Sequence, residues 1–191
     1  MEENMYWYWL SYLNSMEVNE VYKLLEYYGE AKNIYYSNDI ELVNLVTERS
    51  YSIIVSSRDE KKIIESYKNL KNKNIKYIAR IDKEFPVQLY NVYPVPFGIY
   101  LKGSLPSKAL SIAIIGARAA TPYGKEIAKM FSKELSRYGV NIISGLATGI
   151  DGRAHIGALD MKGYTLGILG GGIDSLYPRE NYRLYEAMEG T

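Results

Sequence analysis

Three short apolar runs that end in glycine or small residues decide the fold: SIAIIGA at 111–117, NIISG at 141–145 and YTLGILGGG at 164–172. Each is followed by apolar residues at helical spacing, which predicts helices over 122–138, 150–162 and 179–189. Apolar strands that alternate with amphipathic helices are typical of a parallel sheet covered on both faces. We therefore predict an α/β fold with three layers and a mainly parallel sheet.

Glycine content divides the chain into two parts. Gly29 is the only glycine before Gly98, whereas 14 of the 16 glycines lie from Gly103 onward. The glycine-poor part has helical patterns, with Gly29 as a C-cap and Asn38 or Asp39 as an N-cap, while SYSIIVSS at 50–57 fits either a strand or a helix end. We predict a small helical N-terminal domain over 1–74 and the α/β domain over 75–191.

Composition excludes several classes of protein. The 191 residues include no cysteine and one histidine, so disulfide scaffolds, iron–sulfur clusters, thiolate zinc sites and His-rich metal sites are excluded. The net charge of +1 means that any binding of nucleic acid must come from a local cluster of cations. No apolar stretch reaches the roughly 18–20 residues that span a bilayer, and no secretion signal is present. We expect a cytoplasmic protein without membrane contact, metal or cofactor.

The candidate site lies where the three strands lead into their helices. In a parallel α/β sheet ligands bind at the carboxyl ends of the strands. The connecting segments 116–124, 144–151 and 170–179 are all rich in glycine or small residues. Exposed main-chain N–H groups and helix N-termini at such turns favour an anion, although a single glycine-rich turn can simply be a tight turn. Three such turns on one sheet edge predict a phosphate site.

Two arginines extend this prediction. The segments contain neither GxGxxG nor GxxxxGK[ST], so a dinucleotide fold or a P-loop NTPase is not indicated. Arg118 and Arg179 instead place a guanidinium in two of the turns, and its planar fork suits phosphate oxygens. The alternative for each is a surface arginine or a structural ion pair.

Asp151 and His155 are four residues apart and share one face of a predicted helix. They could form an acid–base pair, but we favour structural roles, with Asp151 capping the helix and His155 buried and hydrogen-bonded. One histidine cannot complete a nucleophile–base–orienter set, so we predict no catalytic residue.

Several motifs of this sequence resemble those of a known family. The runs AIIGARAATPYG at 113–124, GVNIISGLATGID at 139–151 and YPREN at 177–181 resemble the DprA/Smf family of DNA-processing proteins, over residues 75–189. The resemblance implies an extended Rossmann-like fold and a cytoplasmic protein that is not an enzyme. It implies binding of single-stranded DNA and loading of the RecA recombinase in natural transformation, with a possible homodimer. The N-terminal domain is similar to SAM-like or helix-hairpin-helix domains but lacks the GxG hairpin.

The resemblance also implies roles for individual residues. Arg118 matches the arginine of the family's G-[ST]-R motif, with Ala117 in place of the hydroxyl residue, and Ser144 and Gly145 match its SG turn. Arg179 stands where a cation follows YP. The implied phosphate site comprises these groups and their neighbours: Gly116, Arg118, Thr121, Ser144, Gly145, Gly171 and Arg179. Asp151, His155, Tyr177 and Asn181 are structural or possible site residues.

One departure from the family sets a further expectation. Family members continue with more strands and an FPxRNR-like segment, so we expect a C-terminally truncated, incomplete Rossmann-like domain here. The strand at 111–116 should then have a free edge, which favours association. The alternative functions are a nucleotide-binding sensor and a phosphoribohydrolase-like enzyme on the same scaffold.

Overall fold

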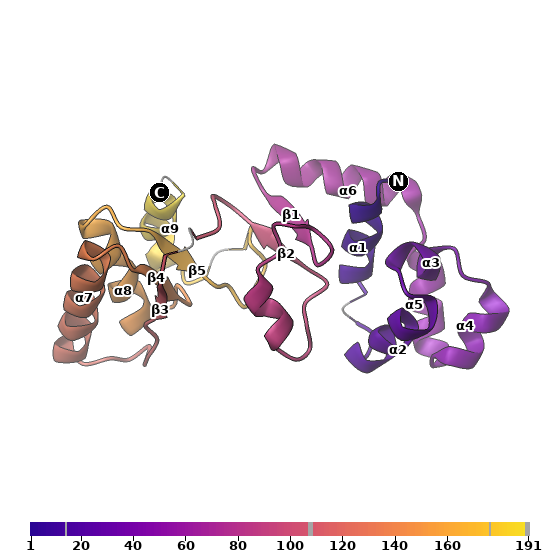
Figure 1. Ribbon diagram of the computed structural model, residues 1–191, viewed down its shortest axis with the longest axis horizontal. Helices are drawn as coiled ribbons and strands as arrows, with labels where there is room; N and C mark the ends of the chain where they lie inside the picture. The colour runs from indigo at the N-terminus through magenta and orange to yellow at the C-terminus, as the bar shows by residue number, and fades with distance from the viewer. Residues whose placement is uncertain (14, 107–108, 176, 190–191) are drawn as a thin grey trace. The chain divides into compact units, whose positions relative to one another are not determined.

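The computed structural model describes residues 1–13, 15–106, 109–175 and 177–189. They form two compact units, Met1–Tyr100 and Leu101–Thr191, each with its own buried core (Figure 1). The division falls later in the chain than position 74 because Tyr77 and Ala79 belong to the core of the N-terminal unit. Among the described residues no helix is both long and apolar enough to cross a membrane.

The N-terminal unit is mainly helical, and its described elements are α1 (Glu3–Ser11), α2 (Val18–Tyr28), α3 (Ala31–Tyr35), α4 (Asp39–Leu45), α5 (Glu48–Ser57), α6 (Glu60–Asn72), β1 (Lys76–Ala79), a 3₁₀ helix (Val87–Asn91) and β2 (Gly98–Leu101). SYSIIVSS is therefore helical rather than extended, and Thr47 caps this helix by accepting a hydrogen bond from Ser50 N. Gly29 ends α2 with φ +79°, and Asn38 caps α4, as predicted from the sequence.

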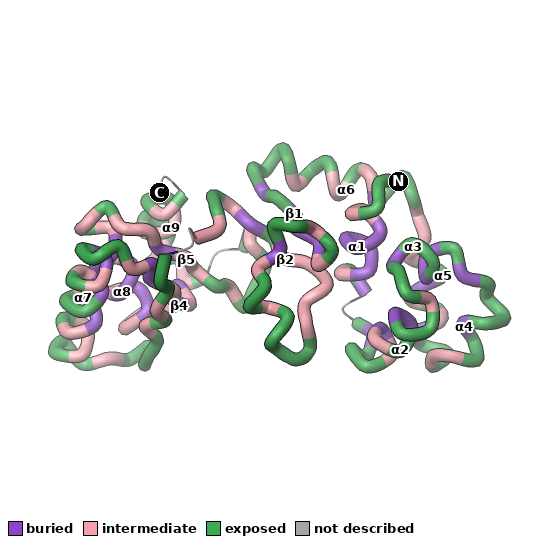
Figure 2. Tube along the Cα trace, viewed as in Figure 1, coloured by how far each residue is buried: buried purple, intermediate pink, exposed green. Residues whose placement is uncertain are grey.

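Helix α1 is the centre of this unit. Tyr6, Trp7, Tyr8, Trp9 and Leu10 are consecutive and all buried, so the helix is apolar on every side rather than along one stripe (Figure 2). It packs against α3, α6 and β1. Its rings pack against those of Tyr35, Tyr67 and Tyr77, with centroid distances of 5.1 to 5.4 Å.

The C-terminal unit contains a three-stranded parallel sheet, and its described elements are β3 (Ser111–Ala113), α7 (Pro122–Arg137), β4 (Asn141–Ser144), α8 (Ile150–Asp160), β5 (Thr165–Gly167), a 3₁₀ helix (Arg179–Asn181) and α9 (Tyr182–Met188). The strand order is β3-β4-β5, with Ser111 opposite Asn141 and Ile142 opposite Thr165. This sequence of parallel strands and crossover helices confirms the predicted Rossmann-like arrangement.

β3 lies at an edge of the described sheet. Its only strand partner among the described residues is β4. Ile115, just beyond the strand, is 73% exposed, although a strand of this composition would be covered in a complete parallel sheet. The predicted free edge is therefore present in the described part of the chain.

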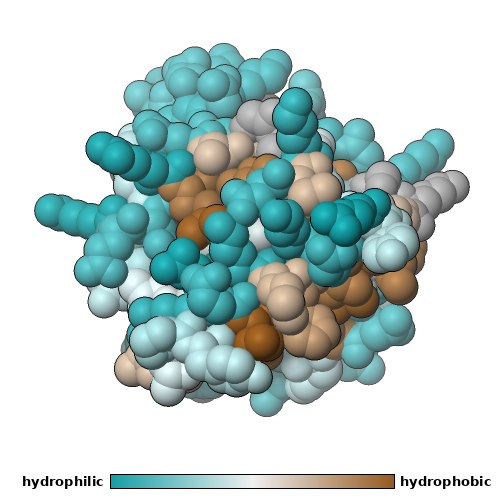
Figure 3. All heavy atoms as spheres, turned by 90° about the vertical axis from the view of Figure 1, so that its left-hand side faces the viewer, coloured by the Kyte–Doolittle hydropathy of each residue, from teal (hydrophilic) through white to brown (hydrophobic). Residues whose placement is uncertain are grey.

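Helices α7 and α8 pack closely through small residues. Ser132 is fully buried and its hydroxyl donates to the carbonyl of Ala154. A Cβ on Gly157 would overlap the carbonyl oxygen of Lys129 and lie 2.9 Å from Ser132 Cβ. Leu135 of α7 packs against the core, whereas Met130 and Phe131 point outward and are 51% and 56% exposed. Figure 3, which faces the side of the molecule that bears α7, shows apolar brown surface among hydrophilic teal atoms.

We expect Gly157→Ala to lower the free energy of unfolding by about 2 kcal/mol, because the overlap with Lys129 O outweighs the gain in helix propensity of about 1 kcal/mol. Chemical denaturation measures this change. Gly170→Ala is the matched control, because its Cβ would meet nothing within 4 Å. An equal loss in the two variants would contradict close packing at Gly157.

Candidate phosphate site at the strand ends

The first two strand-to-helix segments meet backbone against backbone. Gly149, just before α8, has φ +83°, and a Cβ there would overlap the carbonyl oxygens of Ala117 and Arg118. Ile150 N donates to Ala117 O at 3.3 Å. A Cβ on Gly116 would lie 2.7 Å from Ile150 Cγ1. Glycine is required at both positions by this close approach. Gly149 lies in the predicted segment 144–151 but was not among the predicted site residues.

The carboxylate of Asp151 joins the same two segments. Its Oδ1 accepts a hydrogen bond from Gly116 N at 3.2 Å, and its Oδ2 accepts one from Gly145 N at 3.2 Å. The residue is only 7% exposed. Two of the main-chain amides that we predicted for a phosphate are therefore bound to a carboxylate within the protein. Asp151 lies in the first turn of α8, where the helix dipole also favours a negative charge.

Two of the predicted hydroxyl ligands also have partners within the protein. Ser144 is 2% exposed, and its hydroxyl donates to Ile114 O at 2.6 Å, which links β4 to β3. Thr121 is the N-cap of α7, and its Oγ1 accepts a hydrogen bond from Gly124 N at 3.1 Å. Ser144 is too buried to reach a ligand, whereas the exposed Thr121 is mainly a capping residue.

The third segment is attached to the second through Asn181. Its side-chain Nδ2 donates to Leu146 O at 2.9 Å and to Ala147 O at 3.0 Å. Gly171 has open space where a Cβ would be, and Tyr177 is 79% exposed. The three strand ends are therefore held together, the first two by Asp151 and Gly149 and the last two by Asn181.

The groups that remain available to an anion include two guanidiniums and main-chain N–H groups of the first segment. Arg118 and Arg179 are both exposed, and neither guanidinium forms an ion pair or hydrogen bond with another described residue. The main-chain N–H groups of residues 117–120 donate to no other described residue. The described residues also contain no group of three or more His, Asp or Glu side chains that could hold a metal ion.

His155 is enclosed in the core rather than facing this edge. It is fully buried, and its Nδ1 lies 2.7 Å from Thr165 Oγ1, which itself donates to Ile142 O at 3.0 Å. The threonine proton is therefore used, so His155 Nδ1 is the donor and Nε2 carries no proton. Nε2 is buried without a partner among the described residues. Burial lowers the pKa of His155 to about 4, although the charge of Asp151 opposes this change.

We expect Asp151→Asn to lower the free energy of unfolding by about 2 kcal/mol, because a carboxamide has one acceptor oxygen where two amides need one each. Denaturant titration measures the loss. Asp160→Asn is the matched control on the same helix, because its exposed ion pair with Lys129 contributes less than about 1 kcal/mol. Similar effects of the two substitutions would mean that Asp151 does not hold the two segments together.

Acid should destabilise the C-terminal unit through His155. The folded pKa lies below the unfolded value, so the stabilisation is fully present above about pH 6.5 and is lost as the pH falls toward 4. We expect this residue to contribute a loss of about 3 kcal/mol over that range. The measurement compares unfolding free energies of the wild type and His155→Gln at several pH values. If the unfolding free energies of the two proteins changed equally with pH, His155 would not be the source of the loss.

Comparison with known proteins identifies the family. The family model described as DNA recombination-mediator protein A matches residues 76–191. The DNA processing protein DprA of Bacillus subtilis is 39% identical over 120 residues, which cover 62% of this chain and 40% of that protein. The Smf protein of Borreliella burgdorferi is 32% identical over 173 residues, which cover 90% of this chain and 51% of the relative.

A solved structure has the same fold. The crystal structure of DprA from Streptococcus pneumoniae superimposes with a TM-score of 0.76 at 24% identity, over 99% of this chain and 65% of that one. This chain thus spans about half of the length of the curated relatives, or less. Because the family model matches most of the chain, including all three strand ends, the protein belongs to the DNA recombination-mediator protein A family.

Proposed function

We propose that this protein binds single-stranded DNA by holding backbone phosphates at the strand ends of its Rossmann-like unit. The observation that carries the proposal is Arg118, an exposed guanidinium without a described partner, on a loop whose main-chain N–H groups at 117–120 donate to none of the described residues. Gly149 and Asp151 hold this loop in place. A guanidinium beside several main-chain N–H groups suits phosphate oxygens.

Arg179 supplies a second phosphate contact in this proposal. Its segment is attached to the neighbouring one by Asn181, and Tyr177 beside it is exposed and could stack on a base. The buried carboxylate of Asp151 takes the role of anion at Gly116 and Gly145, so the phosphates lie farther out, at the guanidiniums. The membership of the family supports this assignment, since relatives are named DNA processing proteins.

The proposal extends to what happens to the bound DNA strand. The strand held here would be passed to the RecA recombinase in the cytoplasm during natural transformation. With a net charge of +1, one chain would hold few phosphates, and pairing of two chains would raise the apparent affinity. Contact with RecA and pairing of chains are tested by pull-down and by analytical ultracentrifugation with bound oligonucleotide.

The enzyme alternative has less support. His155 is fully buried, and both carboxylate oxygens of Asp151 accept main-chain hydrogen bonds. Neither side chain is therefore placed to move a proton on a bound nucleotide, which favours binding without turnover.

We expect Arg118→Ala to weaken binding of an oligo(dT) strand about tenfold, because one charge-assisted phosphate contact is lost. Fluorescence anisotropy at several salt concentrations also gives the log–log slope, about −1.4 for two phosphates in the wild type and about −0.7 in the variant.

Arg137→Ala is the control, because this exposed arginine lies at the far end of α7 and pairs with Glu134 at 3.1 Å. It should bind like the wild type. Unchanged affinity of Arg118→Ala, or a preference of the wild type for duplex DNA, would reject the proposal.

A further inference from the structure

The N-terminal unit contains a cavity of about 450 Å³ between α6, β1 and the turn after β1. Its size falls in the roughly 300–1,000 Å³ range of small-molecule sites. All of its lining residues belong to this unit, so the cavity does not depend on the strand-end site. No feature of the proposed function accounts for it.

One part of the cavity wall is apolar and aromatic. It is formed by Tyr67, Leu70, Ile75 and Tyr77. Tyr77 is 4% exposed and its hydroxyl donates to Trp7 O at 3.0 Å, so this ring is fixed. The ring of Tyr67 packs edge-on at 5.1 Å from that of Tyr8, and its hydroxyl makes no hydrogen bond with a described residue. These rigid walls suit a flat ring.

Two acidic groups at the cavity already have partners. Asn4 Nδ2 donates to both carboxylate oxygens of Asp82 at 3.0 Å, and Ala79 N donates to Oδ2. Glu84 forms an ion pair with Lys76. The carboxylate of Asp82 is thus fixed in position and keeps lone pairs that can accept from an N–H group of a ligand.

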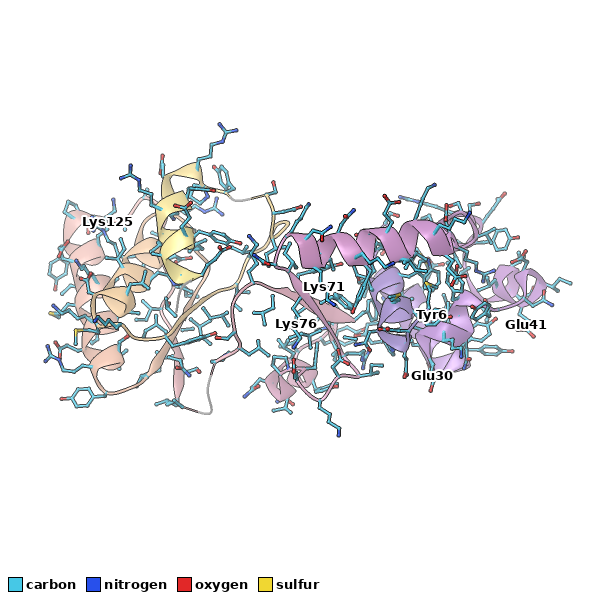
Figure 4. All side chains as sticks on the ribbon, turned by 90° about the horizontal axis from the view of Figure 1, so that it is seen from above. Tyr6, Glu30, Glu41, Lys71, Lys76 and Lys125 are labelled. Atoms are coloured by element: carbon cyan, nitrogen blue, oxygen red, sulfur yellow. The ribbon has the colours of Figure 1, made fainter. Side chains whose placement is uncertain are left out.

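Two lysines at the cavity have no acidic partner among the described residues. Lys71, at the end of α6, and Lys83, in the turn after β1, form no ion pair with a described residue. Figure 4 shows Lys71 beside Lys76 where α6 meets β1. The lining therefore has a net charge of +1, from the three lysines Lys71, Lys76 and Lys83 and the two acids Asp82 and Glu84. The surplus charge favours an anionic ligand.

We propose that this cavity binds a nucleoside phosphate, with the base against Tyr67 and Leu70 and the phosphate at Lys71 and Lys83. A nucleobase is a flat ring whose N–H groups can donate to Asp82, and the phosphate accounts for the unpaired lysines. A fatty acid would leave the Asp82 carboxylate facing an apolar chain, and a free phosphate would leave the rings unused. The nucleotide can be free or part of a DNA strand.

Calorimetry on the full chain tests the site with three probes: dTMP, thymidine and inorganic phosphate. We expect dTMP to bind at least about tenfold more tightly than either of the others, because only dTMP uses both the rings and the lysines. Phosphate that binds as tightly as dTMP would overturn the proposal, and so would the absence of dTMP binding.

Charge reversal locates the ligand. Lys71→Glu should weaken dTMP binding at least about tenfold, whereas Lys68→Glu, an exposed lysine on the same helix outside the cavity, should change it less than about twofold. Tyr67→Leu should weaken dTMP but not phosphate binding. Circular dichroism checks the fold of each variant. Equal effects of Lys71→Glu and Lys68→Glu would overturn the proposal.

Two further measurements separate this site from the strand-end site and identify the source of the nucleotide. Arg118→Ala should leave dTMP binding unchanged, and loss of dTMP binding in that variant would place the nucleotide at the strand ends and reject the cavity. If oligo(dT) competes with dTMP and binds more weakly to Lys71→Glu, the bound nucleotide is part of a DNA strand. If Lys71→Glu binds oligo(dT) as the wild type does, the ligand is a free nucleotide. Oligo(dT) binding insensitive to Arg118 would reject the function proposed above while leaving the cavity intact.

Discussion

The carboxylate of Asp151 is the contact on which the strand-end edge of the Rossmann-like unit depends. It accepts one hydrogen bond from each of two strand ends, at Gly116 and Gly145, and is almost fully buried between them. A buried carboxylate is tolerated only when its oxygens are hydrogen-bonded, and here the two amides and the N-terminus of α8 meet that condition. The loop that carries Arg118 is therefore held by an internal anion rather than by its ligand.

This arrangement separates structural groups from the groups that we propose for ligand binding along the same edge. The amides and hydroxyl nearest the sheet bind to other parts of the protein, at Gly116, Gly145 and Ser144. The guanidiniums of Arg118 and Arg179 extend beyond them into solvent. A site of this kind is preorganised without a ligand, which lowers the entropy lost on binding. Long arginine side chains can also follow a flexible strand better than a rigid amide cradle does.

The two compact units are built on different physical principles. The N-terminal unit surrounds one fully buried aromatic helix, α1, and its rings leave a cavity lined by tyrosines and lysines. The C-terminal unit depends on small residues, with Gly157, Ser132 and Ala154 bringing α7 and α8 into close contact. The family model begins at residue 76 and so leaves most of the first unit unmatched, and the chemistry of that unit has to be inferred from its own contacts.

The sequence by itself determined the succession of parallel strands and helices and the position of Arg118 at a strand end, because these follow from local periodicity and from the glycines that end each strand. The free edge at β3 was expected from the comparison with the DprA/Smf family and not from periodicity. It left SYSIIVSS open between strand and helix, and it assigned Gly116 and Gly145 to a ligand. Only the tertiary structure decided that Asp151 takes those amides and that Lys71 and Tyr67 share a cavity with Asp82. The physical reason is that the packing of whole helices and strands determines which groups far apart in the chain form hydrogen bonds, and a local sequence pattern does not contain this information.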